Sequence, residues 1–408
     1  MGWNSWDCYG AAVTEDTVRR NAEYMAKHLK PFGWEYIVVD IQWYQPTASS
    51  HAYLPFSDLR MDAFGRLLPA GNRFPSAAGD AGFGPLADYV HSLGLKFGIH
   101  IMRGLPRMAA HRRLPIQGSA ATCADAANPN SVCAWNPDMY GLKCDLAAAR
   151  DYYASIFRLY AEWGVDYVKC DDIAREYPHC RREIELISEA CRSCGREIVL
   201  SLSPGPAPLE QAEHLKQYAN MWRITDDFWD EWRLLDAMFE RAEKWCVHAG
   251  PGHWPDADML PVGALRQCYG DPAEWTHFTP AEQRTMMTLW CMMRSPLMIG
   301  ADLPKNDAFT LRLLTNGPLL EIEKSTWCAH PLYSGEDVCA WIAPRRDGTG
   351  CYAALFNRSG ETRTLTLDPA LLEGPWRAAT ELWSGAEAKG VLQATLPPHD
   401  AAVWRIGW

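Results

Sequence analysis

The sequence predicts an α/β fold, namely a (β/α)₈ TIM barrel followed by a small C-terminal antiparallel β-sandwich. Over most of the chain, short apolar runs alternate with segments of helical periodicity, and about eight such repeats indicate a closed parallel barrel covered by helices. Beyond about residue 325, the pattern changes to short alternating segments separated by turns. We therefore expect a barrel domain over residues 1–324 and a sandwich domain over residues 325–408.

The expected barrel strands are short and almost wholly apolar. The first begins within Gly2–Asp7, and the second is Tyr36–Asp40. Continuous apolar runs of this kind are typical of parallel strands that are buried on both faces. The remaining expected strands are Lys96–Ile101, Val165–Asp171, Glu197–Ser203, Met221–Thr225 and Pro296–Gly300.

Segments of helical periodicity lie between these strands. In Thr14–Lys30, residues Val18, Ala22, Met25 and Leu29 share one face, and the threonine with the acidic residues behind it predicts a helix N-terminus. The other expected helices are Pro85–Leu93, Leu146–Trp163, Arg181–Cys194, Leu209–Tyr218, Asp230–Trp245 and Pro280–Met293.

The C-terminal segments alternate polar and apolar residues, as half-buried antiparallel strands do. Turn pairs such as Asp347-Gly348 and Ser359-Gly360 separate them. The expected sandwich strands are Val338–Ile342, Tyr352–Phe356, Thr362–Leu367, Trp376–Leu382 and Ala401–Ile406.

The composition excludes two classes of partner. Among 408 residues, 50 are acidic and 39 are Lys or Arg, which gives a formal net charge of −11. Because no basic cluster stands out, we expect no binding to nucleic acid. The most apolar stretch near the end of the barrel, Leu289–Leu303, is interrupted by Arg294 and Pro296, so we expect no membrane insertion.

The first residues carry neither the basic region nor the apolar region of a secretory signal, which favours a cytoplasmic location, although an export signal trimmed from further upstream is compatible with the sequence. The 14 cysteines are interpreted mainly as reduced, buried thiols. The single CxxC pair, Cys191 and Cys194, lacks the further ligands of a structural zinc site.

Several expected strands end in carboxylates, at the edge of the sheet where a barrel carries its active site. A lone aspartate at such a position often caps the following helix. Asp171 and Asp227 instead lie on opposite strands among aromatic residues, and we take this pair as the catalytic candidates. The other strand-end and loop carboxylates are Asp40, Asp172, Asp226, Asp256 and Asp258.

Two facing carboxylates suit glycoside hydrolysis, in which one attacks the anomeric carbon and the other protonates the leaving oxygen. Tryptophan rings offer a sugar an apolar platform, and tryptophan is abundant here, with 19 residues against 12 phenylalanines. Core packing accounts for part of this number. The tryptophans at or beside expected strand ends are Trp3, Trp6, Trp43, Trp222, Trp229, Trp232 and Trp254.

Five motifs follow one another through the barrel: Gly2-Trp-Asn-Ser-Trp-Asp7, Val168-Lys-Cys-Asp171, Trp222-Arg-Ile-Thr-Asp-Asp227, Trp254-Pro-Asp-Ala-Asp-Met-Leu260 and Arg294-Ser-Pro-Leu-Met-Ile-Gly300. Together they resemble family 27 glycoside hydrolases of clan D, the α-galactosidases and α-N-acetylgalactosaminidases. That family also carries a C-terminal sandwich.

The resemblance implies a retaining double displacement in which Asp171 is the nucleophile and Asp227 the acid/base. Lys169 lies two residues before Asp171 and hence on the same strand face, where it would contact sugar hydroxyls and help to keep Asp171 ionised. Arg223 would hold the substituent at carbon 2 and the region of the acid/base.

The resemblance also implies a set of sugar-binding residues. Trp6 would stack on the ring, and Asp40 would accept hydrogen bonds from the axial 4-hydroxyl or the 6-hydroxyl. Asp258 and Met259 would close the pocket. His100 stands where the family usually places a tyrosine.

The chain departs from the family pattern at three further positions. Asp40 is followed by Ile41 where many relatives have a second acid, which leaves recognition near carbon 6 open. Ser203 stands where galactose-specific relatives have a glutamate, and a small residue there favours a 2-acetamido sugar. Ile173 replaces a cysteine of the family's disulfide, which agrees with a reducing compartment. The long segment between His100 and Leu142 is expected to form a lid.

We expect an exo-acting glycosidase that removes terminal α-linked galactose-type residues from a carbohydrate substrate without a metal or organic cofactor. One alternative is a β-L-arabinopyranosidase on the same scaffold, because that sugar lacks the exocyclic hydroxymethyl group. Another is a metal-dependent barrel hydrolase with His100 among its ligands, although HExxH and His-x-His motifs are missing. A non-catalytic carbohydrate-binding protein would not need both aspartates. The natural aglycone and the oligomeric state, including a homo-oligomer, stay open.

Overall fold

The computed structural model describes residues 1–177, 179–269, 274–372, 374, 376 and 378–408. The chain forms two compact units. Unit 1 comprises Met1–Asp226, Ala264–Trp275 and Met298–Lys305, and unit 2 comprises Asp227–Gly263, Thr276–Leu297 and Asn306–Trp408. The domain boundary that the sequence pattern places between residues 324 and 325 stays a prediction.

Seven strands of unit 1 pair in parallel, in the order β9-β8-β7-β3-β2-β1-β13. Each overlaps an apolar run that the sequence predicts as a strand. Continuous burial along these strands agrees with the absence of polar alternation in their sequences. The strands are β1 (Gly2–Asn4), β2 (Tyr36–Val39), β3 (Lys96–Met102), β7 (Tyr167–Asp171), β8 (Val199–Leu202), β9 (Met221–Arg223) and β13 (Met298–Ile299).

An eighth short strand, β10 (Trp254–Asp256), belongs to unit 2. It is not among the strands that the sequence predicts. The reason is that three residues with a central proline give no strand pattern. With this strand and the helices between the strands, the structure confirms the predicted (β/α)₈ class.

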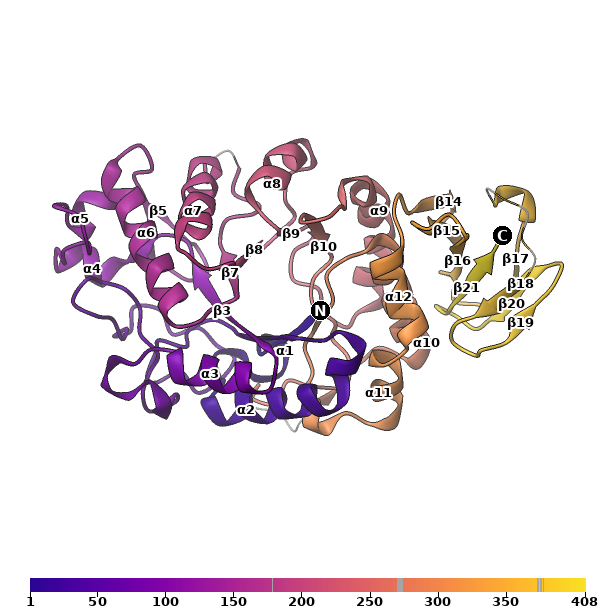
Figure 1. Ribbon diagram of the computed structural model, residues 1–408, viewed down its shortest axis with the longest axis horizontal. Coiled ribbons are helices and arrows are strands. Elements are labelled where there is room, and N and C mark those ends of the chain that lie inside the picture. The colour runs from indigo at the N-terminus through magenta and orange to yellow at the C-terminus, as the bar shows by residue number, and fades with distance from the viewer. Residues whose placement is uncertain (178, 270–273, 373, 375, 377) are drawn as a thin grey trace. The chain divides into compact units, whose positions relative to one another are not determined.

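The longer helices of unit 1 lie on the outer side of its strands (Figure 1). The second helix, α2 (Glu15–Tyr24), begins at Thr14, whose hydroxyl accepts a hydrogen bond from the Thr17 N–H in a capping box. It continues as a π-helical turn through Leu29, close to the expected end. The remaining helices are α1 (Trp6–Tyr9), α3 (Gly84–Ser92), α4 (Arg107–His111), α5 (Cys123–Ala126), α6 (Ala147–Glu162), α7 (Arg181–Ser193) and α8 (Ala212–Tyr218).

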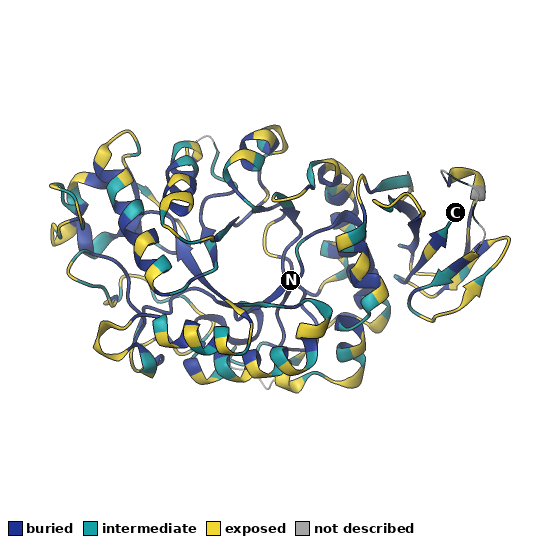
Figure 2. Ribbon diagram, in the orientation of Figure 1, coloured by how far each residue is buried: buried dark blue, intermediate teal, exposed yellow. Residues whose placement is uncertain are grey.

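The strands and the inner faces of the helices form the buried core of unit 1 (Figure 2). Part of the abundant tryptophan fills this core, as expected: Trp3, Trp43 and Trp222 are fully buried. The Trp3 indole donates a hydrogen bond of 2.7 Å to the backbone oxygen of Ala301, which satisfies its buried N–H. Trp6 remains partly exposed.

The segment expected to form a lid is folded. It contains α4, α5 and a three-stranded antiparallel sheet in the order β4-β6-β5. The strands are β4 (Leu105–Pro106), β5 (Ala127–Val132) and β6 (Met139–Leu142). A second small sheet in unit 1 pairs β11 (Ala264–Leu265) with β12 (Glu274–Trp275).

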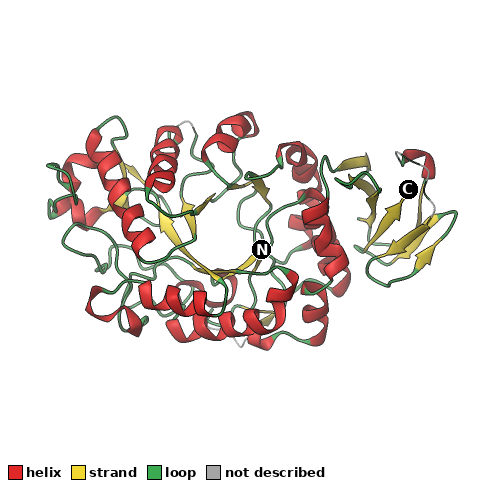
Figure 3. Cartoon of the chain, viewed as in Figure 1, coloured by secondary structure: helices red, strands yellow, loops and turns green. Residues whose placement is uncertain are grey.

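The C-terminal part of unit 2 contains two antiparallel sheets, ordered β14-β15-β16-β21-β18-β19 and β17-β20 (Figure 3). Their apolar faces share one core that includes Leu355, Leu367, Leu392 and Trp404, so the predicted sandwich is confirmed. The strand expected over 376–382 begins later, and its residue 377 lies outside the described residues. The strands are β14 (His330–Ser334), β15 (Val338–Pro344), β16 (Gly350–Asn357), β17 (Arg363–Leu367), β18 (Ala378–Glu381), β19 (Glu387–Ala388), β20 (Leu392–Leu396) and β21 (Ala401–Gly407).

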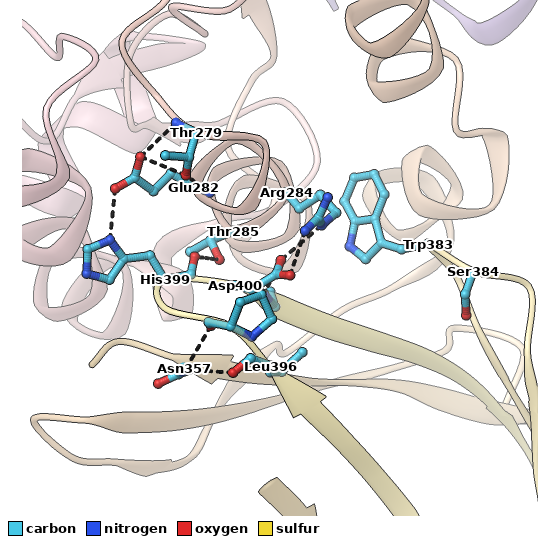
Figure 4. A network of polar contacts seen from close by, with 12 residues as sticks. Thr279, Glu282, Arg284, Thr285, Asn357, Trp383, Ser384, Leu396, His399 and Asp400 are labelled. Atoms are coloured by element: carbon cyan, nitrogen blue, oxygen red, sulfur yellow. Dashed lines mark hydrogen bonds and ion pairs between the residues drawn. The ribbon is translucent and has the colours of Figure 1, made fainter. Parts of the chain in front are cut away.

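Unit 2 also carries helices, of which α10 (Pro280–Met293) packs against β21. The Arg284 guanidinium donates two hydrogen bonds, of 2.9 and 2.6 Å, to the two oxygens of Asp400 (Figure 4). Glu282 accepts one of 2.8 Å from the ring of His399. These contacts join α10 to the turn before β21. The other helices are α9 (Trp232–Trp245), α11 (Ala308–Leu314) and α12 (Gly317–Ser325).

Among the residues that the structure describes, no helix is long and apolar enough to cross a membrane. All 14 cysteines lie in the described part of the chain; none of them forms a disulfide, and ten are buried.

Candidate active site

The strands β1, β2, β3, β7 and β8 bring polar side chains together near their C-terminal ends, the edge where barrels carry their active sites. Hydrogen bonds link these side chains into two groups. One group surrounds Asp171 and the other surrounds Asp40. The residues involved are Asn4, Asp40, His100, Lys169, Asp171 and Ser203.

Asp171 is the last residue of β7 and is buried, with 8% of its surface exposed. Its Oδ2 atom lies 2.9 Å from Nε2 of His100. Its Oδ1 atom accepts a hydrogen bond of 3.0 Å from the Ser203 hydroxyl and one of 3.2 Å from the Asp172 N–H. Both oxygens are therefore held by donors, which fixes the orientation of the carboxylate.

Asp40 directly follows β2 and is almost fully buried. Its Oδ2 atom accepts hydrogen bonds of 2.9 Å from Lys169 Nζ and 2.8 Å from the Asn4 amide. Its Oδ1 atom accepts one of 2.8 Å from the Ile41 N–H, and its own N–H donates to the Ser5 hydroxyl at 2.9 Å. The Lys169 ammonium group thus contacts Asp40. Lys169 itself lies two residues before Asp171, on the same face of β7.

The electrostatics favour ionised carboxylates at both positions. Burial by itself raises the pKa of Asp171, but the hydrogen bond from His100 and the positive charge of Lys169 hold the pKa well below its ordinary value. Burial also raises the pKa of Asp40, but Lys169, His100 and the Ile41 N–H together outweigh it, so the net shift is downward. Asp171 and Asp40 are therefore anionic at neutral pH.

His100 lies in β3 and has no exposed surface. The β3–β7 register places it opposite Lys169, and its ring reaches Asp171 rather than only lining a sugar pocket. Because an ionised carboxylate only accepts hydrogen bonds, Nε2 carries the proton in this contact. Within the described residues, the buried Nδ1 atom makes no hydrogen bond. The Trp43 indole fixes the strand by donating to the His100 backbone oxygen at 2.8 Å.

Ser203 follows β8, and its hydroxyl contacts Asp171. Sequence reasoning assigned it a role in leaving space at carbon 2, and missed that its hydroxyl contacts this carboxylate. The segment after Ser203 is tightly packed, because a Cβ atom on Gly205 would lie 2.4 Å from the backbone oxygens of Arg223 and Thr225. Arg223 itself is buried at the end of β9.

The chain after Asp171 is held by an ion-pair cluster that sequence reasoning also missed. Arg103 lies 2.9 Å from Asp172 and 3.4 Å from Glu183, and it donates a hydrogen bond of 2.7 Å to the Asp172 backbone oxygen. The Tyr153 hydroxyl donates to Glu183 at 2.6 Å. Burial raises the pKa of Glu183, and Arg103 offsets part of this rise. The cluster fixes the backbone next to the candidate nucleophile.

Trp6 begins α1, and its N–H donates a hydrogen bond of 2.8 Å to the Asn4 side chain. Its indole stacks on Tyr53, with ring centroids 5.4 Å apart and planes 8° from parallel. Tyr53 in turn lies 5.2 Å from the ring of Trp135. Tyr53 and Trp135 belong to long connecting segments, and their aromatic character was the one sequence signal that pointed to them.

The remaining candidates belong to unit 2. Asp227 is exposed at the first position of that unit. Asp258 is buried, with a φ of +80°, and its Oδ2 atom accepts a hydrogen bond of 2.8 Å from the Phe228 N–H. The Trp290 indole donates to the Asp258 backbone oxygen at 3.0 Å, and the neighbouring Met259 is buried. The Asp258 side chain is therefore held against the backbone of Phe228, the residue that follows Asp227.

Within the described parts of the chain, no three His, Cys, Asp or Glu residues are grouped so that they could hold a metal ion. The carboxylates at the strand ends are held by lysine, histidine, hydroxyl and amide donors. Chemically, this arrangement presents an oriented anionic carboxylate, as a nucleophile requires.

Comparison with known proteins identifies two family models along the chain. The model for α-galactosidase A matches residues 133–325, and the model for the α-galactosidase C-terminal β-sandwich domain matches residues 335–406. An α-galactosidase of Coffea arabica is 29% identical over 413 residues, which cover 99% of this chain and 92% of that protein.

Two solved structures are more similar. A family 27 β-L-arabinopyranosidase from Geobacillus stearothermophilus is 51% identical, with a TM-score of 0.96 and coverage of 100% of this chain and 96% of that one. A candidate α-N-acetylgalactosaminidase from Bacillus halodurans is 49% identical, with a TM-score of 0.90 and the same coverage.

Proposed function

This chain belongs to family 27 of the glycoside hydrolases, the α-galactosidase-like family, and from that premise we propose that it is a retaining exo-glycosidase selective for terminal β-L-arabinopyranosyl residues. Terminal α-galactosides are then its weaker substrates. The two sugars share the configuration of every ring carbon from 1 to 4, and arabinopyranose lacks the exocyclic hydroxymethyl group.

The observation that carries the choice of sugar is Ile41. It is buried and directly follows Asp40, where a second acid would offer an acceptor to the 6-hydroxyl. An isoleucine side chain has no hydrogen-bonding group, and a hydroxyl that loses water without gaining a partner costs about 1–3 kcal/mol. A sugar without that hydroxyl avoids this cost. The 51% identical relative described as a β-L-arabinopyranosidase supports the same choice.

A second candidate substrate is the α-N-acetylgalactosaminide. The small residue Ser203 after β8 supports it, as does the similarity to the Bacillus halodurans protein. An acetamido group at carbon 2 needs space that a glutamate at this position would fill. The N-acetylgalactosaminide differs from galactose at carbon 2, whereas the role of Ile41 depends on the substituent at carbon 6. One substrate panel therefore separates the two candidate substrates.

In the proposed mechanism, an Asp171 oxygen attacks the anomeric carbon while the bond from that carbon to the leaving oxygen breaks and Asp227 donates a proton to that oxygen. Water then attacks the anomeric carbon of the glycosyl-enzyme, Asp227 takes its proton, and the bond to Asp171 breaks. Two inversions retain the configuration. No step calls for a metal or an organic cofactor.

The donors around Asp171 prepare the first step. His100 and Ser203 hold its two oxygens at 2.9 and 3.0 Å, and Lys169 adds positive charge nearby. Such preorganised donors keep the nucleophile ionised and aimed before the substrate arrives. We assign the sugar hydroxyls to Asp40 and Lys169, and the ring face to Trp6. Arg223, Asp258 and Met259 complete the proposed sugar site.

The test is a panel of 4-nitrophenyl glycosides of β-L-arabinopyranose, α-galactose and α-N-acetylgalactosamine, compared by kcat/KM. We expect the arabinopyranoside to lead the galactoside by at least about tenfold, which corresponds to one unpaired hydroxyl. A galactoside or N-acetylgalactosaminide that leads by the same margin would overturn the choice of sugar.

A substitution tests the role of Ile41 directly. The Ile41→Asp variant restores an acceptor near carbon 6 and should shift the ratio of kcat/KM values toward the galactoside by about tenfold or more. Ile41→Val, which changes volume without adding an acceptor, is the matched control and should leave the ratio near its original value. If Ile41→Asp and Ile41→Val give the same ratio of kcat/KM values for the two sugars, the role assigned to Ile41 is contradicted.

A further inference from the structure

We propose that Tyr53 and Trp135 bind the sugar ring of the leaving group, so that the enzyme selects glycosides with a pyranose aglycone over glycosides of small alcohols. This inference rests on the proposed glycosidase function. Trp6, Tyr53 and Trp135 are together called the aromatic row.

The aromatic row is continuous and incompletely buried. The rings of Trp6 and Tyr53 are parallel within 8°, with centroids 5.4 Å apart, and Tyr53 meets Trp135 at 5.2 Å and 46°. All three residues are partly exposed, in contrast to the core tryptophans Trp3 and Trp43. The aromatic row is therefore not part of the buried core.

The position of the row follows from the topology of unit 1. Trp6 comes directly after β1 and is held by Asn4, which also binds Asp40. Tyr53 lies in the connection after β2, and Trp135 lies in the folded segment after β3. Connections that follow parallel strands surround the active site at the C-terminal edge of a barrel. The row thus begins beside the proposed sugar site and continues along its rim.

The two connections are tied together by one buried carboxylate. Asp138 accepts a hydrogen bond of 3.1 Å from the Gln42 amide and one of 3.2 Å from the Phe56 N–H. The Gln42 side chain also accepts one of 3.1 Å from the Leu54 N–H. Tyr53 lies inside the segment that these bonds anchor at both ends. The rings are therefore positioned before a ligand binds, and little ordering entropy is lost on binding.

A second contact reinforces this arrangement. The Arg107 guanidinium lies 5.1 Å from the ring of Phe56 and 5.0 Å from that of Tyr140. It links the connection after β2 to β6 in the segment that also carries Trp135. The aromatic row is accordingly part of a stable rim.

The chemistry of the rings selects the ligand. Pyranose rings present C–H groups on one face, which pack on aromatic faces and lose water-exposed apolar surface. In an exo-glycosidase, the terminal residue occupies the closed sugar site, and the aglycone extends from the anomeric oxygen toward the rim. A second pyranose ring is long enough to reach beyond the first, whereas a methyl group is not. Tyr53 and Trp135 then contribute to kcat/KM only for the longer substrate.

The test compares two substrates that share the same terminal residue, methyl β-L-arabinopyranoside and a disaccharide with β-L-arabinopyranose linked to a hexopyranose. We expect Tyr53→Ala and Trp135→Ala each to lower kcat/KM on the disaccharide about tenfold, and to change that on the methyl glycoside far less. Tyr53→Phe and Trp135→Phe keep an aromatic face and should retain most of the activity on the disaccharide. Trp327→Ala, at an exposed tryptophan of unit 2, is the matched control.

Equal losses on both substrates would mean that the rings serve only to pack the loops, and would overturn the proposal. So would unchanged kinetics in both alanine variants. If the alanine variants do not fold, Tyr53→Leu and Trp135→Leu, which remove the aromatic face but keep apolar volume, are compared on the same two substrates, and equal losses on both substrates in these variants oppose the proposal. Absence of hydrolysis of both glycosides and of their α-galactosyl counterparts by the wild-type chain would instead refute the proposed glycosidase function.

Discussion

We expect the Lys169→Met variant to lose about 3–5 kcal/mol of unfolding free energy at neutral pH, because the change leaves the Asp40 carboxylate buried without its cation. Lys169 Nζ lies 2.9 Å from Asp40 Oδ2, and the two side chains are 14% and 2% exposed, so solvent screens this pair weakly. Methionine keeps an unbranched apolar stem of similar length, so the loss reports mainly on the charge.

Two remaining donors limit the expected loss. The Asn4 amide and the Ile41 N–H stay on the Asp40 oxygens at 2.8 Å each. A hydrogen bond to a charged group contributes about 1.5–3 kcal/mol to stability. These two bonds still replace part of the water that the carboxylate loses on burial. We therefore expect a value near the lower end of the range, about 3 kcal/mol.

The loss depends on pH with a definite sign. Burial raises the pKa of Asp40, but Lys169 and His100 outweigh it, so the pKa in the folded chain lies below its ordinary value. The ionised carboxylate therefore stabilises the fold above its unfolded-state pKa of about 3.9, and this contribution is lost as the pH falls through the lower folded value. Without Lys169 the folded pKa rises, so the stability gap between wild type and variant shrinks as the pH falls from about 7 toward about 4.

Urea unfolding, followed by tryptophan fluorescence at about pH 7 and about pH 4.5, measures this gap. The double variant Lys169→Met/Asp40→Asn removes both charges and should regain most of the loss at neutral pH. A single-variant loss below about 1 kcal/mol at neutral pH, or a double variant no more stable than the single one, would refute the reasoning.

The acidic limb of the kcat/KM profile should move to higher pH in His100→Leu, because the hydrogen bond from His100 helps to hold the pKa of Asp171 low. His100→Gln keeps a donor and should move the limb less, and an unmoved limb in both variants would contradict this role. Arg284→Lys should lower the unfolding free energy by about 1–2 kcal/mol, since lysine cannot reproduce the two bonds to Asp400, and urea titration checks it. Dialysis against EDTA should leave kcat/KM unchanged; a lasting loss that added metal restores would favour a metal-dependent enzyme.

Local sequence signals predicted the elements whose ends carry strong caps. The helix Pro280–Met293 has the predicted bounds because Thr279 and Glu282 form a capping box around a proline at the first turn. The strand β10 was missed because its three residues include a proline and carry no apolar run. Short strands depend on pairing with neighbours, which a single sequence does not display.

The candidate site was predictable in its residue types and less so in its contacts. Asp40 and Asp171 are predicted because carboxylates at strand ends are visible in the sequence, whereas the role of Lys169 is implied by the family resemblance. The contact of His100 with Asp171 depends on the register between β3 and β7, and that of Ser203 depends on the turn after β8. Such long-range geometry is set by tertiary packing, which a single sequence does not display.

The rim of the site was the least predictable part. Tyr53 and Trp135 are far apart in the sequence, with β3 and several helices between them, yet their ring centroids lie 5.2 Å apart. Asp138 joins the two connections through side-chain and backbone hydrogen bonds that leave no periodic pattern.

The identity of the nucleophile is tested most directly by trapping the glycosyl-enzyme. A 2-fluorinated β-L-arabinopyranosyl fluoride reacts with loss of fluoride and then hydrolyses slowly, so the covalent adduct accumulates. Peptide mapping by mass spectrometry should place one sugar on the peptide that contains Asp171, and the Asp171→Asn variant should remain unlabelled. A label on another carboxylate, or an inactivated enzyme without any adduct, would contradict the assignment.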